Sequence, residues 1–118
     1  MLKKTFKRGI HPLHHQGGGK RPTKSLPIED YVSDSVVISM AMNIGAPAIP
    51  CVKKGDHVLM GQVIGTAGGF VSVPVHASVS GEVIAVDKIP YLGAEPVMAV
   101  TIKNDFNDTW CELNPLGD

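Results

Sequence analysis

Short apolar runs, several of them alternating with polar residues, recur along the chain from Ser35 to Ile102. Gly or Pro interrupts them every few positions, which is typical of short β-strands joined by tight turns. The expected strands lie at 35–39, 58, 63–64, 70–73, 75–79, 83–86 and 97–102. The segment MAMNIGAPAIP at 40–50 predicts a single helical turn, which Gly45 and Pro47 end. This many short strands at close spacing predicts a small barrel or sandwich.

Two segments of the chain echo each other. PCVKKGDHV at 50–58 and HASVSGEV at 76–83 share the order Val, short polar gap, Gly, acid, Val, as two strand–turn–strand units would. Each Gly-acid pair is expected to form a tight hairpin turn. The predicted turn residues are Gly55, Asp56, Gly61, Gly68, Gly69 and Gly81. A positive φ is expected at Gly81, so that Gly81→Val should cost about 1 kcal/mol or more.

The composition favours one small aliphatic domain. The chain has 118 residues, of which 43% are hydrophobic and only 5% aromatic. A chain of this length forms one domain. Its small core, interrupted by frequent turns, predicts little room for a cavity of the several hundred Å³ that small-molecule sites need.

Charge divides the chain into three parts, although 11 basic and 11 acidic residues balance. We interpret residues 1–34 as a basic extended arm, 35–103 as the barrel and 104–118 as an acidic tail or linker. The basic residues before Glu29 are Lys3, Lys4, Lys7, Arg8, Lys20, Arg21 and Lys24. Such an arm could meet nucleic acid, an anionic membrane or an acidic partner, but we interpret it as a solvated arm and predict no nucleic-acid partner.

Neither an iron–sulfur cluster nor a membrane span is expected. Cys51 and Cys111 are too few for a cluster, which takes four thiolates, and the absence of a signal-peptide pattern favours free thiols in a reducing cytosol. The most apolar run, 36–52, contains Ser, Asn and two Pro residues and cannot cross a bilayer as a plain helix.

The candidate chemistry is weak. HPLHH at 11–15 places His11, His14 and His15 together, but no Cys or carboxylate completes a metal site, and their role stays open. GGGKR at 17–21 and GTAGG at 65–69 lack the spacing of phosphate-binding loops. His76 could carry a phosphoryl group, with His57 as its partner, or could support the turn of its own β-hairpin or a domain interface. We predict no catalytic, metal-binding or cofactor-binding residue.

Two segments together resemble the hairpin of biotinyl and lipoyl carrier domains: KKGDHVLMGQVIG at 53–65 and, later in the chain, HASVSGEV at 76–83. The resemblance implies an all-β barrel-sandwich hybrid, a flattened barrel. The carriers attach their cofactor to a lysine between these two motifs, and no lysine lies between Lys54 and Lys88. The tip reads Ala-Gly-Gly-Phe-Val at 67–71 instead, so a carrier would be a degenerate one.

Three longer segments resemble the N-terminal domain of the RnfC family of the Rnf electron transport complex: TFKRGIHP at 5–12, IGAPAIPCVKKGDHVLMGQVIG at 44–65 and GGFVSVPVHASVSGEV at 68–83. In that family this segment precedes a domain that binds flavin and NADH and a domain with two four-iron clusters. The RnfC protein is the electron-input part of a membrane complex that couples NADH–ferredoxin electron exchange to ion pumping. Asn43 departs from the pattern, which has histidine there.

The resemblance implies a non-catalytic structural and docking module of an NADH-oxidising, ion-translocating oxidoreductase subunit. FMN, NADH and two 4Fe-4S clusters would belong to the parent subunit alone. The partners would be its other domains and other Rnf subunits, on the cytoplasmic face of the cell membrane, without a direct membrane span. The end at NPLGD is interpreted as a domain boundary, with a stand-alone homologue left open as the alternative. His76 and Trp110 are interpreted as candidate interface residues. A histidine phosphocarrier using His76 and a degenerate biotinyl or lipoyl carrier stay open as alternatives.

Overall fold

The computed structural model describes residues 23–92 and 94–114. The chain divides into two units between Tyr31 and Val32, three residues before the boundary expected from the charge pattern. Residues 23–31 of the first unit are all exposed, and the Leu26 N–H donates a hydrogen bond to the Thr23 carbonyl. The expectations for His11, His14, His15 and all the basic residues before Lys24 lie outside the described residues.

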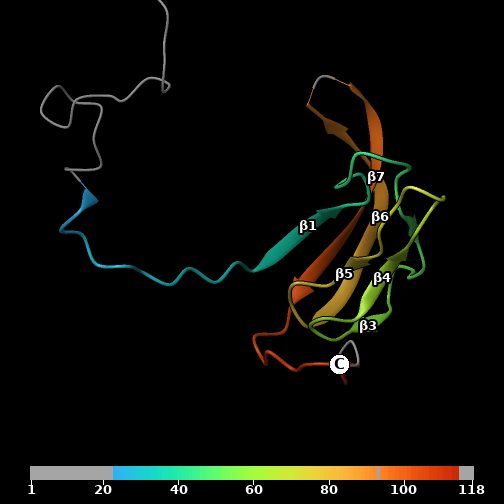
Figure 1. Ribbon diagram of the computed structural model, residues 1–118. Helices are drawn as coiled ribbons and strands as arrows, with labels where there is room; N and C mark the ends of the chain where they lie inside the picture. The colour runs from blue at the N-terminus through green and yellow to red at the C-terminus, as the bar shows by residue number, and fades with distance from the viewer. Residues whose placement is uncertain (1–22, 93, 115–118) are drawn as a thin grey trace, which may run out of the picture. The chain divides into compact units, whose positions relative to one another are not determined.

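The second unit holds two antiparallel sheets that curl into a half-barrel (Figure 1). One sheet has the order β1-β7-β6-β3 and the other the order β2-β4-β5. The strands are β1 (Ser35–Ser39), β2 (Ile49–Pro50), β3 (His57–Val58), β4 (Val63–Thr66), β5 (Val75–His76), β6 (Gly81–Tyr91) and β7 (Ala94–Asn104). The described residues contain no α-helix, and no helix among them could cross a membrane. The all-β prediction is therefore confirmed.

The first strand is confirmed at its expected bounds, but three local expectations are wrong. No helical turn forms at 40–50, because the N–H groups there do not bond to the carbonyl four residues back. The Ala46 N–H donates to the Val71 carbonyl and the Ala48 N–H to the Met40 carbonyl at the start of the same segment, each over 2.8 Å. Residues 70–73 lie in a loop that bends at 70 and 71 and form no strand, and the strand expected at 75–79 ends at His76. Because β6 and β7 pair along a long ribbon, both are longer than expected.

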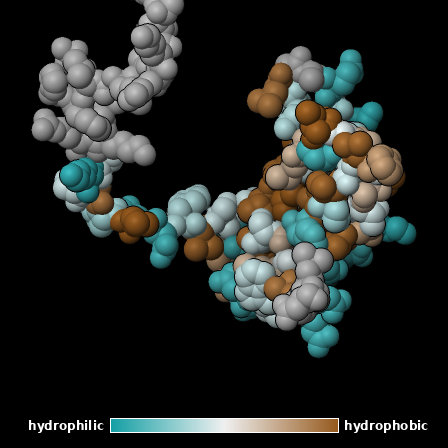
Figure 2. Space-filling view, in the orientation of Figure 1, coloured by the Kyte–Doolittle hydropathy of each residue, from teal (hydrophilic) through white to brown (hydrophobic). Residues whose placement is uncertain are grey.

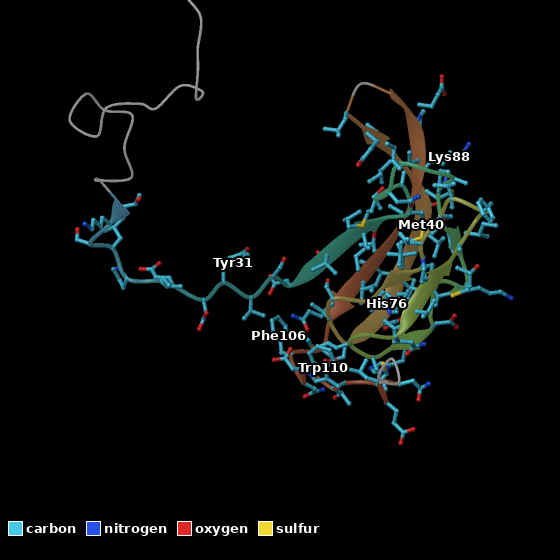
Figure 3. The ribbon with its side chains drawn as sticks, in the orientation of Figure 1. Tyr31, Met40, His76, Lys88, Phe106 and Trp110 are labelled. Carbon is cyan, nitrogen blue, oxygen red and sulfur yellow. The ribbon has the colours of Figure 1, made fainter. Side chains whose placement is uncertain are left out.

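The buried core lies between the two sheets and is aliphatic, as the composition predicts. Its fully buried members come from both sheets and from the segment after β1; they are Met40, Val58, Ile64, Val83, Val100 and Ile102. Met40 lies in the interior of the half-barrel, near the end of β1 (Figure 3). Removing this apolar surface from water holds the two sheets together.

The two echoing segments pair with each other. Val58 of β3 lies opposite Gly81 of β6, and His57 lies opposite Glu82. The Gly55 N–H donates to the Val83 carbonyl over 2.7 Å, and the Val83 N–H donates to the Asp56 carbonyl over 2.8 Å. The echo in the sequence thus marks two segments that meet at the edge of the larger sheet.

Candidate functional site

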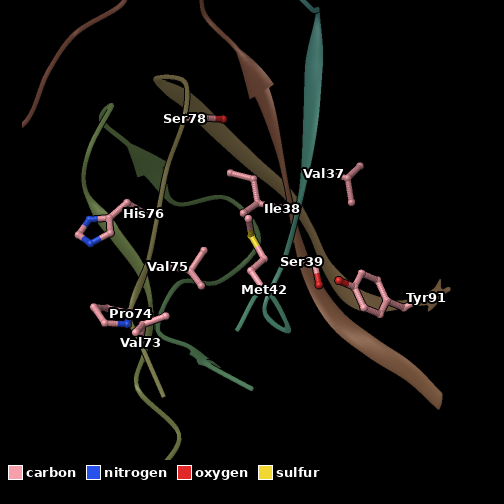
Figure 4. A pocket seen from close by; sticks show the side chains of 10 residues that line it. All are labelled: Val37, Ile38, Ser39, Met42, Val73, Pro74, Val75, His76, Ser78 and Tyr91. Carbon is pink, nitrogen blue, oxygen red and sulfur yellow. The ribbon is translucent and has the colours of Figure 1, made fainter. Parts of the chain in front are cut away.

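An open groove lies between β1 and β5, the edge strands of the two sheets (Figure 4). Its volume is about 560 Å³. Its lining is mostly apolar and consists of Val37, Ile38, Ser39, Met42, Val73, Pro74, Val75, His76, Ser78 and Tyr91. The expectation that the fold leaves little room for such a cavity is therefore wrong, because β1 and β5 are edge strands of different sheets and form the walls of an open groove.

A second hollow of about 420 Å³ lies between the β4–β5 edge and the tail. Its lining includes Gln62, His76, Cys111, Glu112 and Leu113. His76 therefore lines both hollows. No group of three or more His, Cys, Asp or Glu residues that could hold a metal ion occurs in the described part of the chain.

His76 supports a turn, but a different turn from the one expected. Its Nδ1 lies 2.7 Å from the carbonyl oxygen of Gly61, in the turn between β3 and β4. A carbonyl can only accept a hydrogen bond, so Nδ1 carries the proton and donates. In the neutral ring Nε2 is then the acceptor nitrogen. His57, the partner that a paired-histidine site would need, bonds to Asp105 instead.

Two loops beside the groove are tied together and carry exposed apolar side chains. The Ser72 Oγ donates to the Ala46 carbonyl over 2.7 Å and accepts from the Gly68 N–H over 2.9 Å. Ile44 and Phe70 on these loops are fully exposed. Neither 35–52 nor 59–81 contains an Asp, Glu, Lys or Arg. Figure 2 shows hydrophobic side chains gathered between β1 and the smaller sheet. This face is therefore apolar and free of formal charge.

The predicted turn residues have different surroundings. Gly55 and Gly61 have φ values of 94° and 80° and lie in turns, and the Asp56 carboxylate accepts a hydrogen bond from the Lys53 N–H over 2.8 Å. Gly68 and Gly69 lie in the loop after β4. Gly81 has a φ of 151°, but it opens β6 and lies opposite Asn104 of β7. The hairpin turn expected at Gly81 is therefore wrong.

Asn43, where the resemblance expects histidine, lies in the loop after β1. Its Nδ2 donates to the Ala46 carbonyl over 3.3 Å, while its buried Oδ1 has no hydrogen-bond partner in the described part of the chain. Buried polar atoms are seldom left unpaired. The loop therefore holds one unsatisfied acceptor at the position where the sequence departs from the family pattern.

The tail after β7 bonds to the barrel. The Met60 N–H donates to the Thr109 carbonyl and the Cys111 N–H to the Met60 carbonyl, each over 2.9 Å. Trp110 forms a bridge with Met60, yet its side chain is 59% exposed, at the same end as Phe106 (Figure 3). Its packing at an interface stays a prediction. Cys51 and Cys111 are both free thiols, as expected.

Asp105 anchors the start of this tail, a role that no pattern in the sequence indicated. Its Oδ1 accepts hydrogen bonds from the buried Ser80 Oγ over 2.7 Å and the Asn107 N–H over 2.9 Å, and its Oδ2 lies 3.2 Å from His57 Nε2. The hydrogen bond from Ser80, followed by that from Asn107, holds the pKa of Asp105 below its ordinary value, although desolvation opposes this. Segments around β3, β6 and the tail thus meet at one carboxylate.

Asp105→Asn should make the domain less stable at pH 6, and the difference from the parent chain should shrink below about pH 4. The lowered pKa of folded Asp105 means that its contribution is complete above the unfolded value of 3.8 and is lost as pH falls through the folded pKa. Thermal unfolding followed from pH 3 to 7 measures this. Asp108→Asn, in the same tail at an exposed position, is the control. An equal pH dependence in both variants would contradict the prediction.

Taken together, the two sheets that curl into a half-barrel and the aliphatic core between them define the chain as a small all-β domain of the barrel-sandwich class. The family model described as the RnfC barrel sandwich hybrid domain matches residues 4–107. The chain therefore belongs to the RnfC family, through the barrel sandwich hybrid domain of that family, and the predicted family and fold are both confirmed.

Curated relatives agree with this assignment. The chain is 47% identical, over 89% of its length, to the C subunit of the Na(+)-translocating ferredoxin:NAD(+) oxidoreductase complex of Acetobacterium woodii, and covers 23% of that relative. It is 38% identical, over 95% of its length, to the C subunit of the proton-translocating complex of Clostridium ljungdahlii, covering 24% of it. The C subunit of an ion-translocating oxidoreductase complex from Pseudomonas aeruginosa is 38% identical over 90% of this chain. The chain thus spans about a quarter of the first two relatives.

Proposed function

We propose that this chain is a non-catalytic docking and structural module of an NADH-oxidising RnfC protein, in a membrane complex that exchanges electrons between NADH and ferredoxin and translocates ions. The observation that carries the proposal is the apolar, uncharged face formed by the groove and its two tied loops. Interface cores are depleted in charged residues, and a large exposed apolar patch marks an interaction site. The partners would be the other domains of the RnfC protein and other subunits, on the cytoplasmic face of the membrane.

The redox cofactors of the parent subunit, FMN, NADH and two 4Fe-4S clusters, would lie outside this segment. The segment has only two cysteines, and they are not close in sequence. Neither hollow contains a Lys or Arg side chain or a helix N-terminus that could hold a phosphate. The lining of the second hollow also disfavours a phosphoryl group on His76, because the Glu112 carboxylate there would repel its negative charge.

The 118-residue chain should bind neither flavin nor NADH. Both ligands carry phosphates, which proteins hold with backbone N–H groups at a helix N-terminus or with basic side chains. Calorimetric titration with FMN and with NADH measures this, and the full-length RnfC relative of A. woodii, treated in the same way, is the positive control. Micromolar binding of either ligand to the chain would contradict the docking role.

A domain exchange tests the proposal directly. The matching segment of the A. woodii relative is replaced by this chain in one variant and deleted in another. We expect the exchanged protein to join its complex, and the deleted one to be recovered in the complex at less than a tenth of that amount. Both should still oxidise NADH with a soluble artificial acceptor. Normal assembly of the deleted protein, or loss of NADH oxidation with assembly intact, would refute the proposal.

Intact mass separates the docking role from the two carrier alternatives. After incubation with a histidine phosphodonor, or with a biotinyl or lipoyl ligase and its cofactor, the mass should be unchanged. A mass gain of one phosphoryl group in the parent chain that is absent from the His76→Gln variant would establish the phosphocarrier role instead.

A further inference from the structure

Strand β1 is an unprotected sheet edge. It pairs with β7 on one side, and in the described part of the chain no strand pairs with its other side. Natural edge strands are usually protected against pairing with another chain by Pro, by charged side chains, by bulges or by short length. The sequence SVVIS contains neither Pro nor a charged residue, and its pairing with β7 continues without a register shift. The opposite edge of this sheet, β3, has only two residues.

The register shows which backbone groups point out of this edge. The Asn104 N–H donates to the Asp34 carbonyl over 2.9 Å, and the Met40 N–H donates to the Met98 carbonyl over 2.8 Å. Successive residues of an antiparallel strand direct their hydrogen-bonding groups to alternate sides. Residues of even number therefore bond to β7, and Ser35, Val37 and Ser39 direct their N–H and C=O groups away from the sheet. The Ser35 carbonyl accepts a bond from Ser33 Oγ, which leaves Val37 as the centre of the open edge.

The groove lies directly beside this edge. Three consecutive residues of β1 line it, and Val75 and His76 of β5 form the opposite wall (Figure 4). Val37, Met42 and Val73 are each more than half exposed, with exposed fractions of 55%, 66% and 51%. No Asp, Glu, Lys or Arg is among the lining residues. An open main-chain edge thus runs along an apolar, uncharged trough.

We propose that β1 receives an extended segment of a partner polypeptide, which adds as a strand along Ser35–Ser39 and places apolar side chains in the groove. This inference rests on the proposed docking role and names its surface. Main-chain hydrogen bonds to Val37 would align the partner segment along β1, and the apolar walls of the groove would select the side chains at every second position of that segment. A charged side chain buried in the groove would have no partner there, because the lining is uncharged. The partner segment is therefore uncharged over about five residues.

Two other occupants fit less well. The basic arm of this chain would place lysine and arginine side chains against a lining that has no acidic residue. A second copy, paired edge to edge, would have to form a dimer from a groove with 10 lining residues, whereas stable interfaces use about 20–30 residues a side. A short segment carried by a larger partner needs no such area, because other contacts of that partner hold it in place.

The probe is an acetylated and amidated seven-residue peptide in which Thr and Val alternate, titrated into the 118-residue chain and followed by the amide resonances of residues 34–40. We expect saturable shifts centred on Val37 and protection of its amide from hydrogen exchange. The same peptide with every backbone nitrogen methylated keeps its side chains but loses its donors, and should bind at least tenfold more weakly. Equal binding of both peptides, or no shifts in β1, would overturn the proposal.

Variants of the two groove walls complete the test. Val37→Lys on the edge and Val73→Lys on the opposite wall should each weaken peptide binding at least tenfold. Ile84→Lys, the same kind of change on β6 of the same sheet but outside both hollows, should leave binding within twofold. Thermal melts check that each variant folds. Equal weakening by Ile84→Lys would overturn the assignment, as would a dimer of the parent chain that Val37→Lys dissociates, because the occupant would then be a second copy.

The exchanged A. woodii protein separates this inference from the docking role. Val37→Lys in that protein should lower its recovery in the complex, and Ile84→Lys should not. If the exchanged protein assembles and Val37→Lys has no effect, the docking role stands and the edge assignment falls. If deletion of the whole segment leaves assembly unchanged, the docking role itself falls.

Discussion

Gly81→Val should lower the free energy of unfolding by about 3 kcal/mol, more than the turn expected from the sequence would cost. A Cβ at this position would lie 1.9 Å from the Lys103 carbonyl oxygen and 2.9 Å from the carbonyl carbon. Both atoms belong to the backbone of β7, so the clash can be relieved only by separating β6 from β7 or by changing a φ of 151°. Denaturant unfolding followed by circular dichroism measures the loss.

Two alanine variants separate the energetic cost of the close approach to Lys103 from the cost of the positive φ. Gly81→Ala adds only the clashing Cβ and should still cost about 2 kcal/mol or more. Gly55 has a φ of 94°, but a Cβ there would have no atom within 4 Å, so Gly55→Ala should cost only about 1 kcal/mol. Equal costs at the two positions would show that backbone conformation alone makes Gly81 necessary.

Ile64→Ala should lower the free energy of unfolding by about 3–4 kcal/mol. Ile64 of β4 has no exposed surface and belongs to the core cluster that contains Val58, Val83 and Ile102 of the larger sheet. It is the fully buried hydrophobic residue that the smaller sheet contributes. Truncation removes apolar contacts and leaves a cavity between the sheets, which the surrounding backbone can fill only in part.

A graded series checks that the loss comes from burial. Ile64→Val, which removes one methylene group, should cost about 0.5–1.5 kcal/mol. Ile44→Ala makes the same truncation at a fully exposed position, and surface substitutions usually change stability by less than about 0.5 kcal/mol. A loss at Ile44 as large as that at Ile64 would show that Ile44 is buried in solution, and would contradict the exposed face described above.

The sequence by itself determined the class of the fold and the family. The short apolar run between two serines at 35–39 is a local property of the chain, and β1 has those bounds. The absence of aromatic residues from the predicted core likewise follows from composition alone, and the fully buried side chains are aliphatic or small. The motif segments at 44–65 and 68–83 identified the family, since their order and spacing do not depend on the contacts that they make.

Only the tertiary structure decided what the glycines, the loops and the edges do. Gly81 looked like a turn residue, but its role comes from Lys103, more than 20 positions away, whose backbone lies too close for any side chain. Residues 40–50 form no helical turn because the Ala46 N–H bonds to the Val71 carbonyl in another loop, and the Ala48 N–H bonds back to the Met40 carbonyl. The groove could not be foreseen for the same reason: it exists because β1 and β5 are edges of different sheets. Which strand is left unpaired is set by long-range pairing, which no local pattern encodes.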